Sequence, residues 1–139
     1  MITAKEKNQA TLNNFFKAMG KGDKAAMQAC FTDDACWRIP QSFRGNPHED
    51  PTSAKAVVDL LTGATSDFYR PETIRSTPLF VVVDEQHACY QFRMACTAAN
   101  GKAYDNLYVF SFRFEDGLIA EGWEHLDTLY FERTVNQPG

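Results

Sequence analysis

The chain has 139 residues, of which 44% are hydrophobic and 23% charged, ordinary values for a soluble globular protein with one buried core. Its formal charge of −4 argues against a nucleic-acid partner, because phosphate binding needs a clustered basic surface. No run of about 18 apolar residues exists that could form a membrane span, and the first residues lack the apolar core of a signal peptide.

The cysteines and histidines indicate where the protein is expected in the cell and whether a metal or cofactor site is expected. The four cysteines have no Cys-x-x-Cys spacing: Cys30, Cys36, Cys89 and Cys96. Without a signal peptide we expect buried thiols in a reducing, cytoplasmic location. No two histidines share a ligand spacing and no glycine-rich phosphate loop is present, so we expect neither a metal site nor a cofactor.

The first third of the chain predicts two helices and a strand. Apolar residues spaced i, i+3, i+4 and i+7 predict an amphipathic helix: Leu12, Phe15, Phe16 and Met19. This helix should span about Ala4–Met19 and stop at the glycines that follow. Asp23 should cap a short second helix. A first strand is expected over Ala35–Ile39, closed by Pro40.

The middle of the chain predicts a loop, a helix and a strand. Residues 41–51 contain one glycine and two prolines and should form a loop. Thr52 or Ser53 should cap a third helix, which Gly63 should end. Thr73–Val83 should be a strand, with Pro78 at an edge or a bulge because proline cannot donate to the ladder.

The last third of the chain predicts three consecutive antiparallel strands, at His87–Thr97, Lys102–Phe114 and Leu118–Phe131. Asn100-Gly101 is the strongest signal for a two-residue hairpin turn, because a type I′ turn needs positive φ at both central residues. Residues 115–117 fit a three-residue loop with a glycine bulge.

These turns predict which side chains share a face. Under them Arg93 lies opposite Tyr108, and Tyr108 lies opposite Glu124. The row contains a base, a phenol and an acid, and it is flanked by Phe110 and two further phenylalanines. Asn106 follows along the same face. The sequence therefore predicts a candidate site on this row.

Helices followed by a run of antiparallel strands predict an α+β fold, with three helices packed on the concave face of a curved sheet. Both faces of the three-strand meander carry apolar side chains, so both need to be covered. The helices can cover one face. We expect a second copy of the chain to cover the other, which makes a homodimer.

The order of elements, together with three segments, resembles the cone-shaped nuclear transport factor 2-like fold, and its SnoaL-like branch in particular. The segments are Phe31–Pro40, Tyr104–Tyr108 and a longer stretch that runs from Phe112 to Thr128. The branch is related to polyketide cyclases, ketosteroid isomerases and limonene epoxide hydrolases. The resemblance implies one SnoaL-like domain over residues 1–139.

Site residues of these relatives match this chain only in part. The Asp-Arg-Asp triad of limonene epoxide hydrolases falls on Gln91, Arg93 and Glu124, and only Glu124 keeps a carboxylate, which disfavours epoxide hydrolysis. The position of the isomerase base is Ile39, so that base is absent. The proton-shuttling aspartate of the cyclases is matched best by Asp127.

The resemblance implies a small cofactor-independent enzyme of cyclase or isomerase type, which moves a proton next to a carbonyl of a small apolar substrate in the cone. The catalytic candidates are Glu124, Tyr108 and Asp127. The substrate-binding candidates are Arg93, Asn106, Gln91, Trp37, Arg38, Phe110 and Phe16. The alternation of a strand sends only one of Trp37 and Arg38 inward.

The alternative is a protein that binds a small apolar ligand without catalysis. Glu124 would then form a structural ion pair with Arg93, and Tyr108 would be a core tyrosine. A Glu124 that faces an apolar cavity, away from Arg93, would instead have a raised pKa and favour the enzyme.

Overall fold

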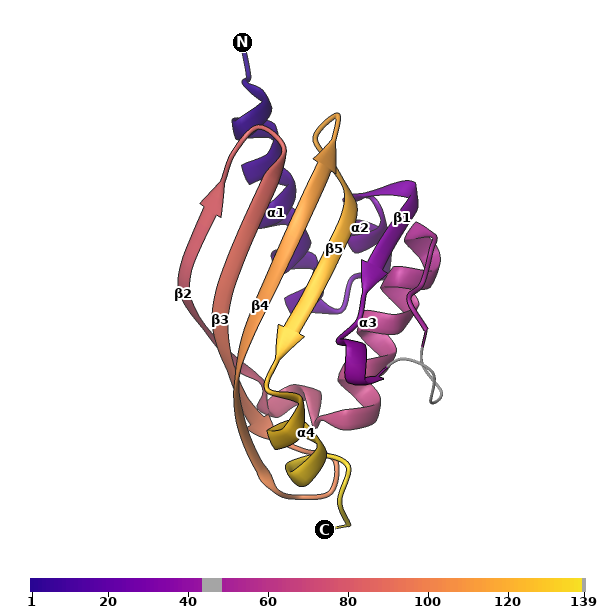
Figure 1. The fold of residues 1–139 in the computed structure, drawn as a ribbon, viewed down its shortest axis with the longest axis vertical. Coiled ribbons are helices and arrows are strands. Elements are labelled where there is room, and N and C mark those ends of the chain that lie inside the picture. Colours follow the sequence, from indigo (N-terminus) through magenta and orange to yellow (C-terminus); the bar gives the residue numbers. More distant parts are fainter. Residues whose placement is uncertain (44–48, 139) are drawn as a thin grey trace.

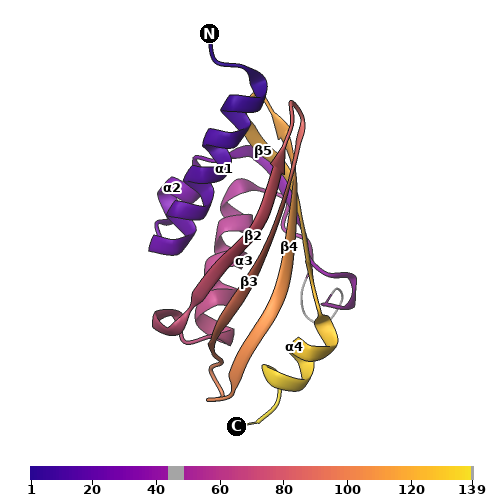
Figure 2. The same ribbon diagram turned by 90° about the vertical axis from the view of Figure 1, so that its left-hand side faces the viewer.

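The computed structural model describes residues 1–43 and 49–138, and the part of the predicted loop at 44–48 lies outside them. One five-stranded sheet has the order β1-β5-β4-β3-β2, with β1 parallel to β5 and the other pairs antiparallel. Three helices, α1 to α3, lie along one side of this curved sheet, and α4 lies at its lower end (Figures 1 and 2). The predicted α+β fold is confirmed.

The elements have the following bounds. The helices are α1 (Ala4–Lys21), α2 (Lys24–Gln28), α3 (Ala54–Phe68) and α4 (Thr128–Thr134), with short 3₁₀ turns η1 (Gln41–Phe43) and η2 (Pro71–Thr73). The strands are β1 (Phe31–Arg38), β2 (Arg75–Val83), β3 (His87–Thr97), β4 (Ala103–Glu115) and β5 (Leu118–Leu126).

Most helix boundaries follow their caps. The side chain of Asp23 accepts a hydrogen bond from an N–H in the first turn of α2, and Ser53 does the same for α3. Gly22 ends α1 at a φ of 66°, a left-handed conformation that favours glycine. The predicted end of the third helix at Gly63 is wrong. An interior glycine weakens a helix by only about 1 kcal/mol, and α3 continues to Phe68.

The first hairpin of the meander differs from the prediction. The N–H of Ala98 donates to the carbonyl of Lys102 at 2.8 Å, so the loop has three residues, and Gly101 adopts a φ of 90°. Arg93 therefore lies opposite Leu107 instead of Tyr108. A shift of one residue moves a side chain to the other face, so the predicted row is wrong at Arg93.

The second hairpin has the tighter turn. Asp116 and Gly117 have φ values of 49° and 79°, the signature of a two-residue turn, and Glu115 pairs with Leu118. A bulge lies between Arg113 and Phe114, opposite Ala120, and Glu124 therefore lies opposite Phe110. The predicted pairing of Tyr108 with Glu124 is wrong, because Tyr108 lies opposite Leu126. The two side chains still share the inner face, two positions apart along the ladder.

The final strand is shorter than predicted. β5 ends at Leu126, and Asp127 becomes the N-cap of α4, where its carboxylate accepts a hydrogen bond from the N–H of Tyr130 at 3.0 Å. The prediction that the strand reaches Phe131 is therefore wrong. The short helix instead places Phe131 in the core at the lower end of the sheet.

Every second side chain of β4 faces the helices and is buried: Tyr104, Asn106, Tyr108, Phe110, Phe112 and Phe114. Phe15 of α1 packs edge-on against Phe112, with ring centroids 5.9 Å apart. The core thus lies between the inner sheet face and the helices. The four cysteines form no disulfides. The expectation of buried thiols is confirmed for Cys30 and is wrong for Cys36, Cys89 and Cys96, which are partly exposed.

Candidate functional site

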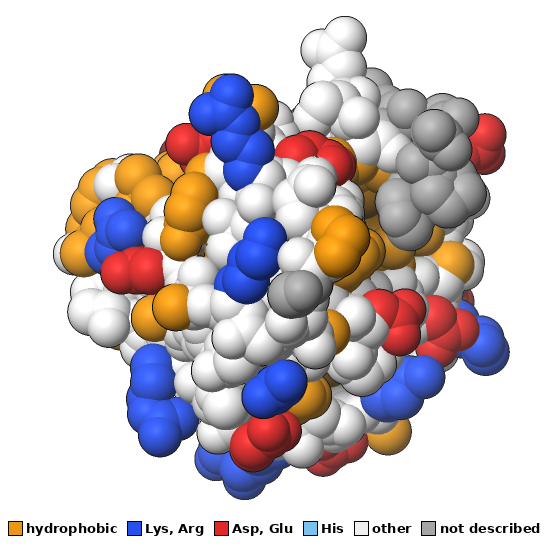
Figure 3. All heavy atoms as spheres, turned by 90° about the horizontal axis from the view of Figure 1, so that it is seen from below, with side chains coloured by type: hydrophobic (Ala, Val, Ile, Leu, Met, Phe, Trp, Pro, Cys, Tyr) orange, Lys and Arg blue, Asp and Glu red, His pale blue; other side chains and the backbone are white. Residues whose placement is uncertain are grey.

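A cavity of about 250 Å³ lies between α3, the end of β5 and α4. Most of its lining is apolar and comes from Ile39, Pro40, Phe43, Leu60, Leu61, Gly63, Ala64, Phe68, Leu126 and Phe131. Four polar residues also line it: Asp59, Asp67, Tyr69 and Glu124. This composition, a mostly apolar wall with a few polar groups, is typical of small-molecule sites. Seen from below, the same end of the molecule has hydrophobic side chains at its surface among scattered charged ones (Figure 3).

Glu124 is the acid of this cavity. It projects from the inner face of β5, and its Oε1 accepts a hydrogen bond from Trp37 Nε1 at 3.2 Å. Burial among apolar groups raises the pKa of Glu124 from 4.5 to about 7, and the Trp37 hydrogen bond opposes this rise. A carboxyl group with a pKa near neutrality can both accept and return a proton, as a general acid–base catalyst must.

Three tyrosine hydroxyls form a chain that ends at the same cavity. The hydroxyl oxygens of Tyr69 and Tyr108 are 2.9 Å apart, and those of Tyr108 and Tyr104 are 2.7 Å apart. Asn106 Nδ2 donates to the Tyr104 hydroxyl at 2.9 Å. Burial raises the pKa of all three phenols, so they keep their protons and act as hydrogen-bond donors.

The amide of Asn106 has one orientation. Its Oδ1 accepts from the N–H of Leu107 at 2.8 Å, and its Nδ2 also donates to the carbonyl of Asp127 at 3.1 Å. The Tyr104 hydroxyl therefore accepts from Asn106, whereas in each tyrosine pair either hydroxyl can donate. Tyr69 is the member of the chain that lines the cavity.

Tyr69, which sequence reasoning missed, is the phenol that lines the cavity. Tyr108 was the predicted donor, but it is only 5% exposed, lies behind Tyr69 and does not line the cavity. Tyr69 follows the end of α3, a segment that the prediction placed outside the helix. The spacing of Leu60, Ala64 and Phe68, four residues apart, is the signal that could have extended the helix to this point.

Of the predicted site residues only Glu124 lines the cavity, and Arg93, Gln91 and Asp127 are among those that do not. Arg93 is exposed on the outer face, where its Nε donates to Asp105 Oδ1 at 3.1 Å. Gln91 lies on the same outer face, opposite Val109. Asp127 is exposed and caps α4. The predicted ion pair between Arg93 and Glu124 is therefore wrong, because the sheet separates the two side chains.

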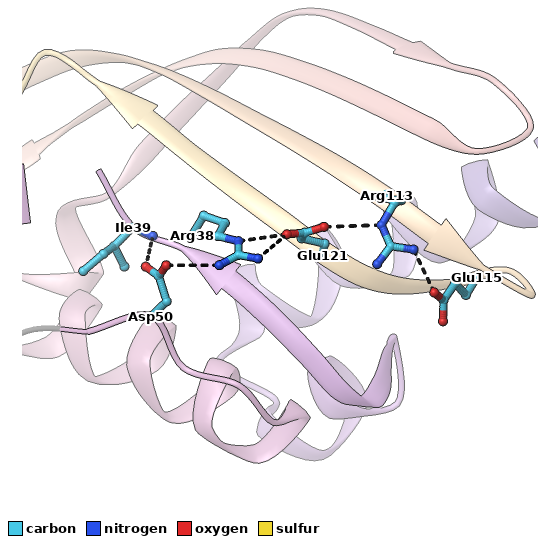
Figure 4. Close-up of polar contacts among 6 residues, drawn as sticks. All are labelled: Arg38, Ile39, Asp50, Arg113, Glu115 and Glu121. Atoms are coloured by element: carbon cyan, nitrogen blue, oxygen red, sulfur yellow. Dashed lines mark hydrogen bonds and ion pairs between the residues drawn. The ribbon is translucent and has the colours of Figure 1, made fainter. Parts of the chain in front are cut away.

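Arg38 points outward, as strand alternation requires once Trp37 points inward. Its guanidinium contacts Glu121 Oε2 at 2.8 Å and Asp50 Oδ2 at 3.6 Å, and Glu121 also binds Arg113 (Figure 4). The other oxygen of Asp50 accepts from the N–H of Ile39 at 2.9 Å. This network holds in place the segment after β1, which forms one wall of the cavity.

The two predicted aromatic binding residues belong to the core. Phe110 lies opposite Glu124 and meets the Trp37 ring edge-on, with centroids 5.1 Å apart. Phe16 stacks on Tyr90 at 4.3 Å. Neither ring lines the cavity, so each acts through packing.

A larger hollow of about 460 Å³ lies on the outer sheet face, and it brings together three predicted site residues, Arg93, Asn106 and Asp127. The exposed Arg93–Asp105 pair lines it together with His125. Within residues 1–43 and 49–138, no three His, Cys, Asp or Glu side chains gather as metal ligands. No helix of that part of the chain is long and apolar enough to cross a membrane.

Comparisons with solved structures support the fold. A protein of unknown function from Burkholderia pseudomallei, described as NTF2-like, is 18% identical over 94% of this chain and 98% of its own, with a TM-score of 0.82. A putative SnoaL-like polyketide cyclase from Jannaschia is 16% identical over 97% of this chain and 95% of its own, with a TM-score of 0.80. TerC, co-crystallized with polyporic acid, is 13% identical over 94% of this chain and 99% of its own, with a TM-score of 0.81.

Sequence comparison identifies the family. No curated protein sequence matches the chain significantly. The family model described as the SnoaL-like domain matches residues 12–122, which is most of the chain and includes α3, Tyr69, the tyrosine chain and the Trp37 strand. The chain therefore belongs to the SnoaL-like family.

Proposed function

We propose that this protein is a small cofactor-independent enzyme of cyclase or isomerase type, in which Glu124 moves a proton next to a carbonyl of a small apolar substrate. The observation that carries the proposal is that a carboxyl group with a pKa of about 7 and the phenol of Tyr69 line one apolar cavity. A base and an oxyanion donor that face the same space are the two groups that enolization requires.

The reaction follows from these two groups. The ionized carboxylate takes a proton from the carbon next to the carbonyl, the C–H electron pair becomes the C=C bond of the enolate, and the π pair of the C=O bond moves onto oxygen. Tyr69 donates its hydrogen bond to this oxygen, and the Tyr108 hydroxyl lies 2.9 Å from that of Tyr69. The protonated Glu124 then returns the proton to another carbon of the enolate. In a cyclization the enolate carbon instead adds to a second carbonyl of the substrate, whose C=O π pair takes the proton from Glu124 and becomes a hydroxyl group.

The cavity also bounds the substrate. At about 250 Å³ it lies just below the 300–1,000 Å³ that is typical for drug-sized ligands, so a compact molecule fits. The rings of Phe43 and Phe68 both contact Phe131, each with centroids 5.2 Å apart, and they give the cavity aromatic walls. Similarity to a putative polyketide cyclase and to TerC, which was co-crystallized with polyporic acid, supports a small organic ligand.

Two observations weigh against the alternatives. A ligand-binding protein without catalysis was expected to pair Glu124 with Arg93, but Arg93 binds Asp105 on the outer face. An epoxide hydrolase would need groups at positions 91 and 93 beside Glu124, and both of those side chains face away from it.

The proposal is tested by deuterium exchange, which requires no knowledge of the product. Small cyclic ketones are incubated with the protein in D₂O, and loss of the α-proton signal is followed by NMR. We expect Glu124→Gln to lower the exchange rate at least ~100-fold, as is typical when a general base is lost. The matched control Asp105→Asn removes a carboxylate from the outer face and should keep the wild-type rate.

Two outcomes would contradict the assignment. Exchange that survives Glu124→Gln but is lost in Asp127→Asn would assign the proton transfer to Asp127. Ketones that bind tightly in the cavity, with no exchange above that of the buffer, would support the ligand-binding alternative.

We also propose a homodimer formed through the outer face of the sheet. Three apolar side chains on that face are strongly exposed: Phe80 at 51%, Val82 at 60% and Leu107 at 37%. A second copy that covers them would place both cavities on the outside of the assembly, each behind its own sheet.

A further inference from the structure

Trp37 lies in a gap that only glycine can provide. The indole is fully buried, and Trp37 pairs with Gly122 across the parallel strands β1 and β5. A Cβ atom built on Gly122 would lie 2.4 Å from Cε3 and Cζ3 of the Trp37 ring, a distance that real Cβ contacts do not reach. Gly122 does not have a positive φ, so its role is to leave space for the indole.

The gap lets the indole reach along β5. Gly122 and Glu124 are two residues apart, so both face inward, and about 6.6 Å of strand separates them. The ring crosses Gly122 and its Nε1–H donates to Glu124 Oε1 at 3.2 Å. A buried indole N–H needs an acceptor, and Glu124 provides it.

This contact distinguishes the two oxygens of the carboxylate. Oε1 is held by Trp37, whereas Oε2 has no hydrogen-bond partner among the described residues. In that part of the chain every buried side-chain nitrogen or oxygen has a partner, so Oε2 is accessible. Because Glu124 lines the cavity, Oε2 is the oxygen that meets a ligand.

We propose that Trp37, seated over Gly122, is a positioning residue that holds Oε1 of Glu124 and thereby presents Oε2 as the atom that exchanges protons with the ligand. The inference rests on the proposed function for its reaction, but the contact itself can be tested without a substrate. If Trp37 only packed in the core, its contacts with Phe15, Phe110 and Phe112 would be sufficient. Its indole N–H signal would then not depend on the ionization of Glu124.

The first measurement uses the unmodified protein. The indole ¹H–¹⁵N signal of Trp37 is followed across pH together with the ¹³C signal of the Glu124 carboxyl group, assigned with Glu124→Gln. Other acidic groups near this carboxyl are Tyr69 at the end of α3 and Asp59 and Asp67 on α3. We expect the indole and carboxyl signals to titrate with one midpoint near pH 7.

The second tryptophan is the internal control. Trp123 lies on the outer face, opposite Ser111 and in one hollow with His87, so the pH dependence of its signal should be the same in Glu124→Gln as in the wild-type protein. Trp123→Phe assigns the two indole signals. A Trp37 signal that stays flat while Glu124 titrates would overturn the proposal.

The third measurement uses variants. Trp37→Phe keeps an aromatic ring but removes the N–H that favours the charged carboxylate, so the Glu124 midpoint should rise by roughly one pH unit. Gly122→Ala should displace the indole, so the Glu124 midpoint should rise in this variant as well. Phe112→Leu alters the packing around Trp37 without removing the N–H, so the Glu124 midpoint should stay at the wild-type value in this variant. A Trp37→Phe midpoint equal to the wild-type one would also overturn the proposal.

The same variants separate this inference from the proposed enzyme. In the exchange assay, Trp37→Phe should move the acidic limb of the pH–rate profile to higher pH, together with the midpoint of the Glu124 carboxyl group. An indole that follows Glu124 in a protein whose Glu124→Gln variant still catalyses exchange would support the positioning contact and reject the proposed function. An indole that is independent of Glu124 would reject the contact, whatever the exchange rate.

Discussion

The burial of Glu124 has a consequence for stability that depends on pH. Its native pKa of about 7 lies above the ordinary 4.5, so the native state holds this proton more tightly than the unfolded chain does. Its contribution to stability is therefore fully present below pH 4.5 and is lost as the pH rises through 7. By linkage the difference amounts to about 3 kcal/mol.

We expect the free energy of unfolding of the wild-type protein to fall between pH 5 and pH 8 relative to that of Glu124→Gln, which does not ionize. Urea unfolding of both proteins at several pH values measures this difference. Parallel curves would mean that the carboxyl group is solvated in the native state and that its pKa is ordinary.

The exchange rate should depend more on the hydroxyl of Tyr69, which lines the cavity, than on those of Tyr108 and Tyr104. Tyr69→Phe removes the donor that faces the carbonyl oxygen, and we expect a loss of roughly 10²-fold in the exchange rate, the typical cost of one oxyanion donor. Tyr104→Phe should cost less, because Tyr69 keeps its proton. Tyr130→Phe is the control, since its hydroxyl only accepts from the N–H of Asp105. Equal losses for Tyr69→Phe and Tyr130→Phe would contradict this role.

Single residues of the site were predictable where only the face of a strand mattered. Glu124, Trp37 and Asn106 were all named from the sequence, and all three take part in the polar contacts at or behind the cavity. Arg93 was misplaced because its face depended on the length of one turn. Tyr69 was missed because it lies beyond a helix whose end was placed too early.

At the scale of elements, the order of helices and strands and most caps followed from local signals, whereas register did not. The two hairpin loops exchanged the lengths expected of them. Asn100 did not form the tight turn, because its Nδ2 donates to the carbonyls of Thr134 and Gln137 at 2.8 and 2.6 Å. Such a contact with the distant end of the chain is not visible in local sequence. The bulge between Arg113 and Phe114 kept Glu124 on the inner face although the turn was shorter than expected.

The same asparagine should hold α4 against the sheet. Asn100→Ala removes the donor to Thr134 and Gln137 and the acceptor for the N–H of Lys102, so we expect a loss of about 1–3 kcal/mol and faster amide exchange in α4. Urea unfolding and hydrogen exchange measure the two effects. Asn136→Ala is the control, since Asn136 only contacts the exposed Glu132. Unchanged exchange in α4 of Asn100→Ala would show that Phe131 alone anchors the helix.

For the whole molecule, the exposed surface favours association. The chain exposes 7934 Å², whereas a compact monomer of its mass exposes about 7,300 Å². β2 is an edge strand that presents apolar side chains to solvent, which natural proteins usually avoid or cover.

We therefore expect light scattering to give twice the monomer mass at micromolar concentration. Val82→Glu places a charge among the exposed apolar side chains of the outer face, where no partner charge is provided, and should shift the protein to the monomer. Ile2→Glu is the control, because Ile2 is 64% exposed just before α1, a helix on the other side of the sheet, and the dimer should persist. A monomeric wild-type protein, or an Ile2→Glu variant that dissociates as readily as Val82→Glu, would reject the outer face as the interface. Because the cavity lies on the other side of the sheet, the Val82→Glu monomer should keep its Glu124 titration near pH 7.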